Sequence, residues 1–429
     1  MSTIFGARAA HAPPVTRDLT PMARLHGLGY VVLVAGLLVL YVTMLSWNIR
    51  IGYDFSCFRA ASILLAHGGN PYDAAQLWRQ ENLLYNLPFH LRGGALGYYA
   101  FDPYNNPLLF AWALTPLAAL PYTESYAIYT AVVVGCAVAG AWLSLQALGW
   151  TRHRTVAISI ALIVPGSFLT VWWGQQSTLL FCAFGAALLA LRHGRPGLGG
   201  ALLVLAWIKP HLLLPVILMA PLLVEKRAAL RWCGGFGLAS GLAAGLNILA
   251  TGPGSIAAWL NDLVEYSGHV DTSQGWMPSL AGTAMVLAPH PWNRPFALAV
   301  MVCGLVVMVA IAAHARRAHV APLAALCTLT AAWLLFTPYV HPNDSVLALP
   351  ALALAWRRGQ GARGQGARGL AGGLPVLTLW AMSALPLAFL LPRPLELLGL
   401  LPPILVLLAA IYAPALSSAG EATGKRRPL

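Results

Sequence analysis

Long runs of apolar residues follow one another along almost the whole chain, and short polar segments separate them. The first run, HGLGYVVLVAGLLVLYVTMLSW (26–47), has the length of roughly 20 residues that an α-helix needs to cross a bilayer. It is too long for a secretory signal peptide and lacks a small-residue cleavage site, so we interpret it as a retained first helix. The pattern predicts an all-α polytopic membrane protein with about 12 transmembrane helices. The expected crossings are 26–47, 124–148, 155–171, 177–191, 198–209, 210–224, 232–250, 295–313, 320–336, 344–356, 371–391 and 396–413.

Three of these crossings, 198–209, 210–224 and 344–356, are too short for a straight span. Broken or half-length helices are tolerated in a membrane only where their ends line an enclosed or watery cavity, so the short runs indicate such a cavity. Two further apolar stretches, 107–121 and 279–288, are expected to be interfacial or re-entrant. If either crossed the membrane, every later segment would change sides.

Composition excludes a water-soluble globule, because 59% of the residues are hydrophobic, only 9% are charged, and the mean hydropathy is +0.70. A net charge of +13 would suggest nucleic acid as the partner of a soluble protein. Here the basic residues form short clusters between apolar runs, which is the positive-inside pattern of cytoplasmic loops, so no nucleic acid partner is expected. The six cysteines are scattered without ligand spacing and are interpreted as small core residues.

Placing the basic clusters inside leaves almost every unusual polar residue on the opposite face. The outer segments are 48–106, 172–176, 251–277, 337–344 and 391–394. Within the first, 56–66 and 74–87 have the spacing of amphipathic helices and are expected to lie along the membrane surface. We expect one integral membrane domain (1–429). Its parts are a first extracytoplasmic loop (48–106), a transmembrane core (107–356), a basic cytoplasmic loop (357–369), C-terminal helices (370–413) and a cytoplasmic tail (414–429).

Asp54 is one of only 13 acidic residues and follows the first apolar run closely. It lies seven residues beyond Trp47, a plausible interfacial anchor, so it is expected at or just under the outer surface. An ionisable group at that depth is a functional hypothesis by default. The alternative is that Asp54 is the N-cap of a helix that starts near Phe55.

Lys209 stands between two apolar stretches, LLVLAWI and PHLLLPVILM. A lysine there is costly unless it meets an anion, and a phosphate group would suit it. The alternative is a lysine whose head reaches water along its own stem.

Two polar turns hold further candidates. His341 and Asp344, in TPYVHPND, either bind substrate or form a polar turn before a short helix. Gln175 and Gln176 follow Trp173 in WWGQQS, a pairing of amides and aromatic rings that suits sugar hydroxyls and ring faces, but also suits an ordinary interfacial turn. No phosphate-binding loop, nucleophile elbow or metalloprotease motif competes with these candidates.

Taken in order, several motifs together resemble glycosyltransferase family 87, over about residues 50–350. They are Asp54 with GGNPYD (68–73), FDPYNNPLLFAWALTPLAALP (101–121), WGQQSTLLF (173–181), GRPGLGGALLVLAWIKPHLLLPVILMAPLL (194–223) and TPYVHPND (337–344). These enzymes belong to the GT-C superfamily and depend on polyprenyl-phosphate sugars; α-mannosyltransferases typify them. Two elements depart from the family pattern: YNNP replaces a Tyr-Pro-Pro-like element, and QGWMPSL replaces an often Asn-rich segment. Both bear on acceptor choice.

The resemblance implies a GT-C fold and an inverting transfer of a sugar, with mannose the first candidate, to a hydroxyl of a glycolipid or polysaccharide. Asp54 takes the place of the catalytic aspartate, as general base. The donor phosphate would be bound by Lys209, Arg59 and His341. The sugar or acceptor would be bound by Gln175, Gln176, Trp173, Tyr104 and Asp344.

Other readings of function follow from the same residues. A transporter or flippase for a lipid-linked or small polar substrate would also have broken helices and charges at membrane depth, but no internal repeat is evident. A single carboxylate without an acidic partner argues against a divalent metal, and no cofactor is expected. The Ala, Leu, Gly and Arg-rich composition indicates a bacterial plasma membrane protein whose site faces the periplasm.

Overall fold

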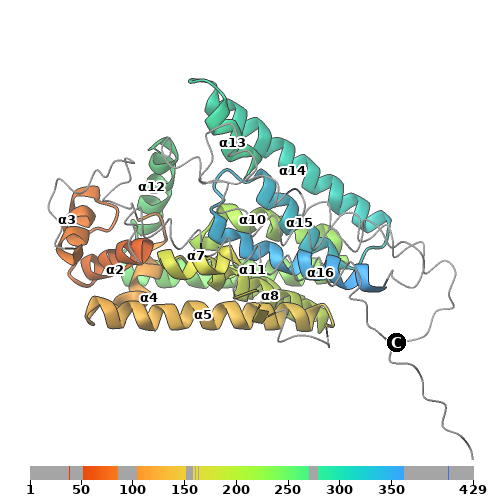
Figure 1. Cartoon of the computed structure of the whole chain (residues 1–429), viewed down its shortest axis with the longest axis horizontal. Coiled ribbons are helices and arrows are strands. Elements are labelled where there is room, and N and C mark those ends of the chain that lie inside the picture. The colour runs from red at the N-terminus through yellow and green to blue at the C-terminus, as the bar shows by residue number, and fades with distance from the viewer. Residues whose placement is uncertain are drawn as a thin grey trace, which may run out of the picture.

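The computed structural model of the chain describes residues 52–85, 104–150, 158–159, 161–162, 164–269 and 279–361, with single positions at 38 and 404. All regular secondary structure in these residues is helical, which confirms the all-α prediction (Figure 1). The α-helices are α2 (Tyr53–Ala66), α3 (Ala74–Tyr85), α4 (Leu108–Ala118), α5 (Tyr122–Ala147), α7 (Pro165–Trp173), α8 (Ser177–Arg192), α9 (Pro196–Leu202), α10 (Pro210–Met219), α11 (Lys226–Thr251), α12 (Ser255–His269), α13 (Leu280–Leu287), α14 (Asn293–Arg317), α15 (Pro322–Phe336) and α16 (Leu349–Gly361). The 3-10 helices are η2 (Leu203–Ile208), η3 (Ala220–Leu223) and η6 (Pro342–Ala348).

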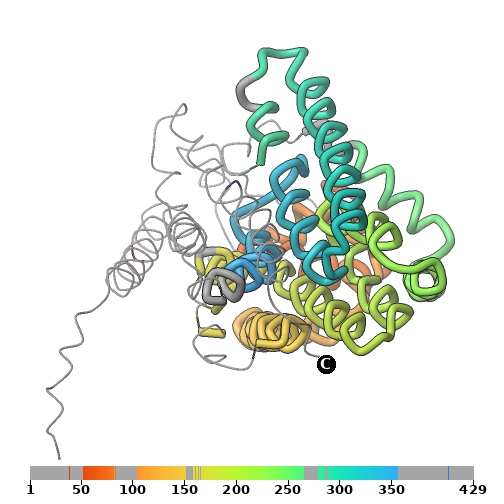
Figure 2. The backbone as a smooth tube through the Cα atoms, turned by 90° about the vertical axis from the view of Figure 1, so that its right-hand side faces the viewer, coloured from red at the N-terminus to blue at the C-terminus, as the bar shows by residue number. Residues whose placement is uncertain are grey.

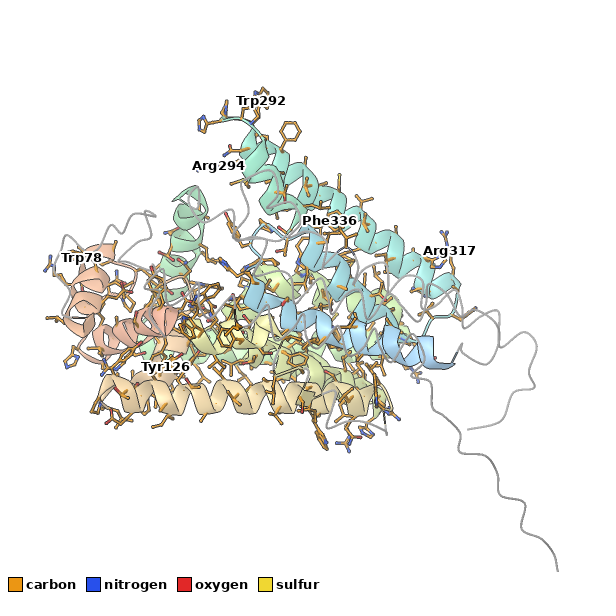
Figure 3. The ribbon with its side chains drawn as sticks, viewed as in Figure 1. Trp78, Tyr126, Trp292, Arg294, Arg317 and Phe336 are labelled. Carbon is orange, nitrogen blue, oxygen red and sulfur yellow. The ribbon has the colours of Figure 1, made fainter. Side chains whose placement is uncertain are left out.

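Three described helices, α5, α11 and α14, are long and apolar enough to cross a membrane. They coincide with the expected crossings 124–148, 232–250 and 295–313. In α14, the exposed Trp292 and Arg294 stand at one end and Arg317 at the other, as in helices anchored at both interfaces (Figure 3). These helices support a membrane protein, while the count of twelve crossings stays a prediction.

Several expected elements fall partly or wholly outside the described residues. Outside the described residues lie the crossings 26–47, 371–391 and 396–413, except for positions 38 and 404. The cytoplasmic tail and most of the basic loop also lie outside them. The remaining expected crossings are represented by shorter helices. Both stretches expected to be interfacial or re-entrant, 107–121 and 279–288, are short helices, α4 and α13.

Prolines set the breaks in the short helices. The stretch expected as a crossing at 198–209 is α9 followed by η2, and α10 starts only at Pro210. Proline lacks the backbone N–H and has a fixed φ, so it fits the first turn of a helix, where that N–H has no partner. Lys209 is the N-cap of α10 and therefore lies at the junction of two helices.

The largest cluster of buried apolar side chains joins α8, α10, α15 and the η6–α16 segment. Phe184, Leu212, Trp333 and Leu347 represent these four elements in it. Figures 1 and 2 show α5 along one side of the molecule and α14 along the opposite side, with this core between them. The turns discussed below lead directly into this rigid core.

The segment 56–66, expected to lie along the membrane surface, falls in α2; its position relative to the membrane stays a prediction, but the helix packs inside the protein over most of its length. All residues of α2 from Asp54 to Ser62 are buried, because the helix packs against α4 and its N-terminal turn meets α5. The ring of Phe55 lies among the rings of Tyr122, Tyr126 and Tyr129, at centroid distances of 5.8, 5.4 and 4.7 Å. The helix that carries Asp54 is thus part of the core, whereas α3 keeps an exposed face with Arg79 and Leu83.

Two glycines in the left-handed region bring the start of α2 against the turn between α7 and α8. Gly52 has φ 78°, and its N–H donates to the carbonyl of Trp172 at 2.7 Å. Gly174 has φ 76°, and a Cβ there would lie 2.5 Å from the Cβ of Phe55. A side chain at Gly174 would therefore push the two segments apart.

We predict that Gly174→Ala lowers the thermal unfolding temperature of the detergent-solubilised protein. The left-handed conformation alone costs an L-residue about 1–2 kcal/mol, and the contact with Phe55 adds to it. The control is Gly135→Ala in α5, an exposed helical glycine with no atom within 4 Å of the new Cβ, which should be neutral or stabilising. Equal unfolding temperatures of the two variants would contradict the close approach.

Candidate active site

The α7–α8 turn (residues 174–177) binds two distant segments with consecutive glutamines. Gln175 Nε2 donates to Asp54 Oδ2 at 2.7 Å. Gln176 Nε2 donates to Asn106 Oδ1 at 2.7 Å, just before α4. The turn thereby joins α2 and the entry to α4, which precede it by 121 and 70 residues.

Asp54 is the second residue of α2, because Gly52 is the N-cap and the helix starts at Tyr53. The hypothesis that Asp54 is the N-cap is therefore wrong. Its side chain is largely buried, and a carboxylate in the first turn is stabilised by the positive end of the helix dipole. Because a carboxylate accepts hydrogen bonds and cannot donate them, the Gln175 amide must turn its nitrogen toward Asp54. The amide fixes the orientation of the carboxylate.

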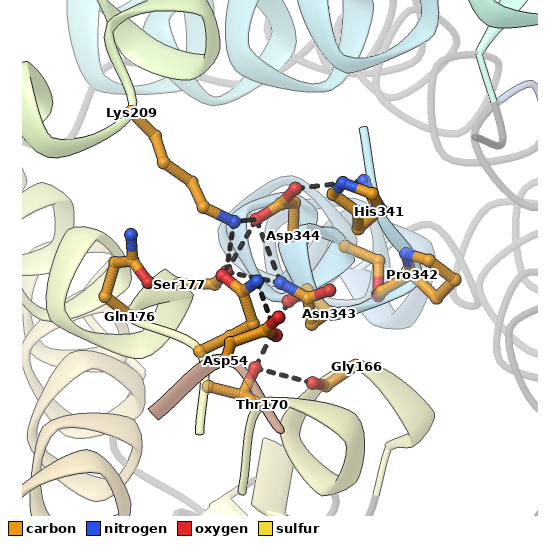
Figure 4. A network of polar contacts seen from close by, with 12 residues as sticks. Asp54, Gly166, Thr170, Gln176, Ser177, Lys209, His341, Pro342, Asn343 and Asp344 are labelled. Carbon is orange, nitrogen blue, oxygen red and sulfur yellow. Dashed lines mark hydrogen bonds and ion pairs between the residues drawn. The ribbon is translucent and has the colours of Figure 1, made fainter. Parts of the chain in front are cut away.

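A second polar cluster lies one residue further along the same turn (Figure 4). Ser177 Oγ donates to Asp344 Oδ1 at 2.5 Å, and Lys209 Nζ lies 2.9 Å from the same oxygen. Asn343 Nδ2 donates to Ser177 Oγ at 2.8 Å. Lys209 is 8% exposed and Asp344 is fully buried. Lys209 thus meets an anion inside the protein, and the alternative of a head reaching water along its stem does not describe it.

His341 and Asp344 form the polar turn that precedes η6. The backbone N–H of His341 donates to Asp344 Oδ2 at 3.0 Å, and the N–H of Asp344 donates back to the His341 carbonyl at 2.9 Å. Both carboxylate oxygens of Asp344 are therefore occupied, one by this turn and the other by the Lys209 cluster. As a whole residue, His341 is only partly buried.

Three sequence candidates lie apart from these contacts. The guanidinium of Arg59 donates to the carbonyls of Ala118 and Leu120, at 3.3 and 2.5 Å, where α4 ends. Tyr104 is buried, and its hydroxyl donates to a backbone carbonyl at the start of α4. Trp173 is the last residue of α7 and is half-buried.

Four residues that the sequence analysis did not select belong to these clusters: Asn106, Ser177, His211 and Asn343. Each lies within two residues of one that was selected or within the same motif, so proximity along the chain was the available signal. Among the described residues, no group of three or more His, Cys, Asp or Glu side chains is arranged to hold a metal ion.

We predict that Lys209→Met destabilises the protein by about 3–5 kcal/mol, because it leaves Asp344 as an unpaired buried charge. Thermal unfolding in detergent measures the loss, with Lys226→Met at the exposed start of α11 as the control. Adding Asp344→Asn to Lys209→Met should recover part of the loss. A Lys209→Met variant as stable as the control would contradict a buried ion pair.

Comparison with known proteins supplies the class of enzyme. The family model described as glycosyltransferase family 87 matches residues 104–338, more than half of the chain. The match covers the α7–α8 turn, the Lys209 junction and the segment up to Pro338. No curated protein and no solved structure matched. On the family match, the chain belongs to glycosyltransferase family 87.

Proposed function

We propose that the protein is an inverting glycosyltransferase that moves a sugar, with mannose the first candidate, from a polyprenyl-phosphate donor to a hydroxyl acceptor at the extracytoplasmic face. Membership of the family supplies the reaction class. The observation that carries the proposal is the 2.7 Å hydrogen bond from Gln175 to the largely buried carboxylate of Asp54. It supports a carboxylate held in one orientation, which a general base requires.

Asp54 would act on the acceptor. Its carboxylate takes the proton from an acceptor hydroxyl while that oxygen forms a bond to the anomeric carbon of the sugar. The bond from the anomeric carbon to the phosphate oxygen breaks on the opposite face, and its electron pair leaves with the polyprenyl phosphate. One displacement of this kind inverts the configuration. In this mechanism Gln175 is a positioning residue.

Lys209 would stabilise the phosphate of the donor as it leaves. The helix junction at Pro210 supports this role, because it puts the ammonium group where its charge acts on His211 and His341, two residues that are only partly buried. We assign Asp344 to Lys209 as its counter-ion and no longer propose that it binds sugar, since both of its oxygens are occupied. Arg59 is likewise assigned to the end of α4.

The remaining candidates concern the sugar and acceptor. Gln176 and the half-buried Trp173 stay proposed sugar contacts, because they flank Gln175 in the chain. Tyr104 is proposed to support them indirectly, since it fixes the start of α4 next to Asn106, the partner of Gln176. The acceptor is proposed to be a glycolipid or polysaccharide in a bacterial envelope. The comparisons give no support to a transporter.

The test is sugar transfer by purified protein from polyprenyl-phosphate mannose, comparing the native enzyme with Asp54→Asn. Loss of a general base typically costs about 10²–10⁴-fold in rate, so we expect a drop of this size. Asp73→Asn is the matched control: Asp73 lies in the same loop, is only partly buried and caps α3 through the N–H groups of Ala75 and Gln76. The control should transfer sugar within about twofold of the native rate. An Asp54→Asn enzyme as fast as native, and equally folded, would overturn the assignment of the base.

A further inference from the structure

The proposed phosphate site carries no net charge in this structure. Lys209 contributes one positive charge and Asp344, 2.9 Å away, cancels it. The glycosyl phosphodiester of a lipid-linked donor carries one negative charge. Bringing that charge next to a neutral, buried pair costs free energy unless another positive charge arrives with it. The charge balance therefore requires a second cation, which Lys209 alone does not supply.

His211 lies close to Lys209 in the chain and is our candidate for this second cation. It follows Lys209 by two residues, in the first turn of α10, and its ring stands nearly perpendicular to that of Tyr339, with centroids 6.0 Å apart. The carbonyl of His211 accepts from Trp333 Nε1 at 2.5 Å and from Thr337 Oγ1 at 3.1 Å. These contacts fix the start of α10 to the end of α15 and to the segment that leads into η6.

The surroundings of His211 are few and can be named. The charges that act on its ring are those of Asp344, Lys209 and His341, and the ring packs against the ring of Tyr339. The neighbouring elements α15, η2 and η3 carry no acidic or basic side chain. Helix α14 also packs against α10, and its basic side chains lie exposed near its two ends: Arg294, His314, Arg316 and Arg317. Around His341 the charges that act are again those of Asp344 and Lys209. Asp344 and Lys209, the two charges that act on both rings, are paired with each other.

The contacts of the two histidines differ, and this difference indicates that His211, and not His341, takes up the proton. The His211 ring packs edge-to-face against the ring of Tyr339, and its imidazole can carry a proton on both nitrogens. His341 is engaged through its backbone N–H, with Asp344. As whole residues, both histidines are less buried than Lys209 and Asp344.

We propose that the phosphodiester of the lipid-linked donor binds beside Lys209 together with one proton, which His211 holds as an imidazolium. This inference rests on the proposed function and adds a residue and a proton to it. When the bond between the sugar and the phosphate oxygen breaks, the electron pair stays on the phosphate, which then carries a further negative charge. The imidazolium offsets this charge and can give its proton to the departing phosphate.

A proton taken up on binding makes the affinity depend on pH. Above the range in which free His211 is protonated, each unit of pH weakens binding by up to about tenfold for one proton. Because the protein takes up a proton when the donor binds, the donor binds more tightly at low pH and more weakly as pH rises. The phosphodiester itself keeps a single charge across this range, so the dependence would arise in the protein.

The experiment measures binding, so that it does not depend on sugar transfer. The probe is radiolabelled farnesyl methyl phosphodiester, and its dissociation constant is measured with the detergent-solubilised full chain at pH 6 and pH 8. We expect the native protein and Asp54→Asn to bind at least about tenfold more tightly at pH 6. His211→Gln should bind with nearly equal affinity at both pH values. His314→Gln, at the exposed end of α14, should behave as native.

Two results would overturn the inference. One is a native affinity that is the same at both pH values. The other is a His211→Gln variant that keeps the full pH dependence while its unfolding temperature is native. If Asp54→Asn transferred sugar normally while the pH dependence of binding was present, the proposed base would fail and the proton-coupled phosphate site would stand.

Discussion

The α7–α8 turn holds the candidate active site together, because three consecutive side chains on it contact three segments that are far away in sequence. Gln175 binds Asp54, Gln176 binds Asn106 and Ser177 binds Asp344. A turn of four residues can do this only if the chain approaches α2 closely. Gly174 and Gly52 allow that approach, since both adopt a conformation that other residues rarely reach. The geometry of Asp54 thus depends on backbone contacts that precede any catalytic chemistry.

The Lys209–Asp344 pair has a different physical basis. Taking two charges out of water costs about as much as their attraction returns, so a pair this deeply buried adds little net stability. The pair instead holds two chain segments in place. Asp344 closes the turn before η6, and Lys209 is the residue at the break before α10. The three hydrogen bonds that Asp344 Oδ1 accepts, from Ser177, Lys209 and Asn343, bring α8, α10 and η6 to one point. We infer that the chain keeps the pair for this meeting point.

Much of the fold was predictable, because length and hydrophobicity decide where a helix runs. The crossing expected at 124–148 is α5, at Tyr122–Ala147, and the short runs on either side of Pro210 are indeed broken helices. The burial of α2 was not predictable from its own residues, since it depends on partners in α4 and α5. The sequence marked Lys209 and Asp344 as unusual, but 135 residues separate them, and nothing in one unaligned chain pairs them. Residues such as Ser177 and Asn343 are too common in turns to stand out.

The central claim is that the Gln175-oriented carboxylate of Asp54 faces the reacting sugar. An experimental structure of the protein with a non-transferable polyprenyl-phosphonate sugar tests it most directly. We expect the anomeric carbon on the side of Asp54, the phosphonate beside Lys209 and His211, and the hydrogen bond from Gln175 to Asp54 still present. A sugar bound away from Asp54, with the phosphonate against other residues, would contradict it.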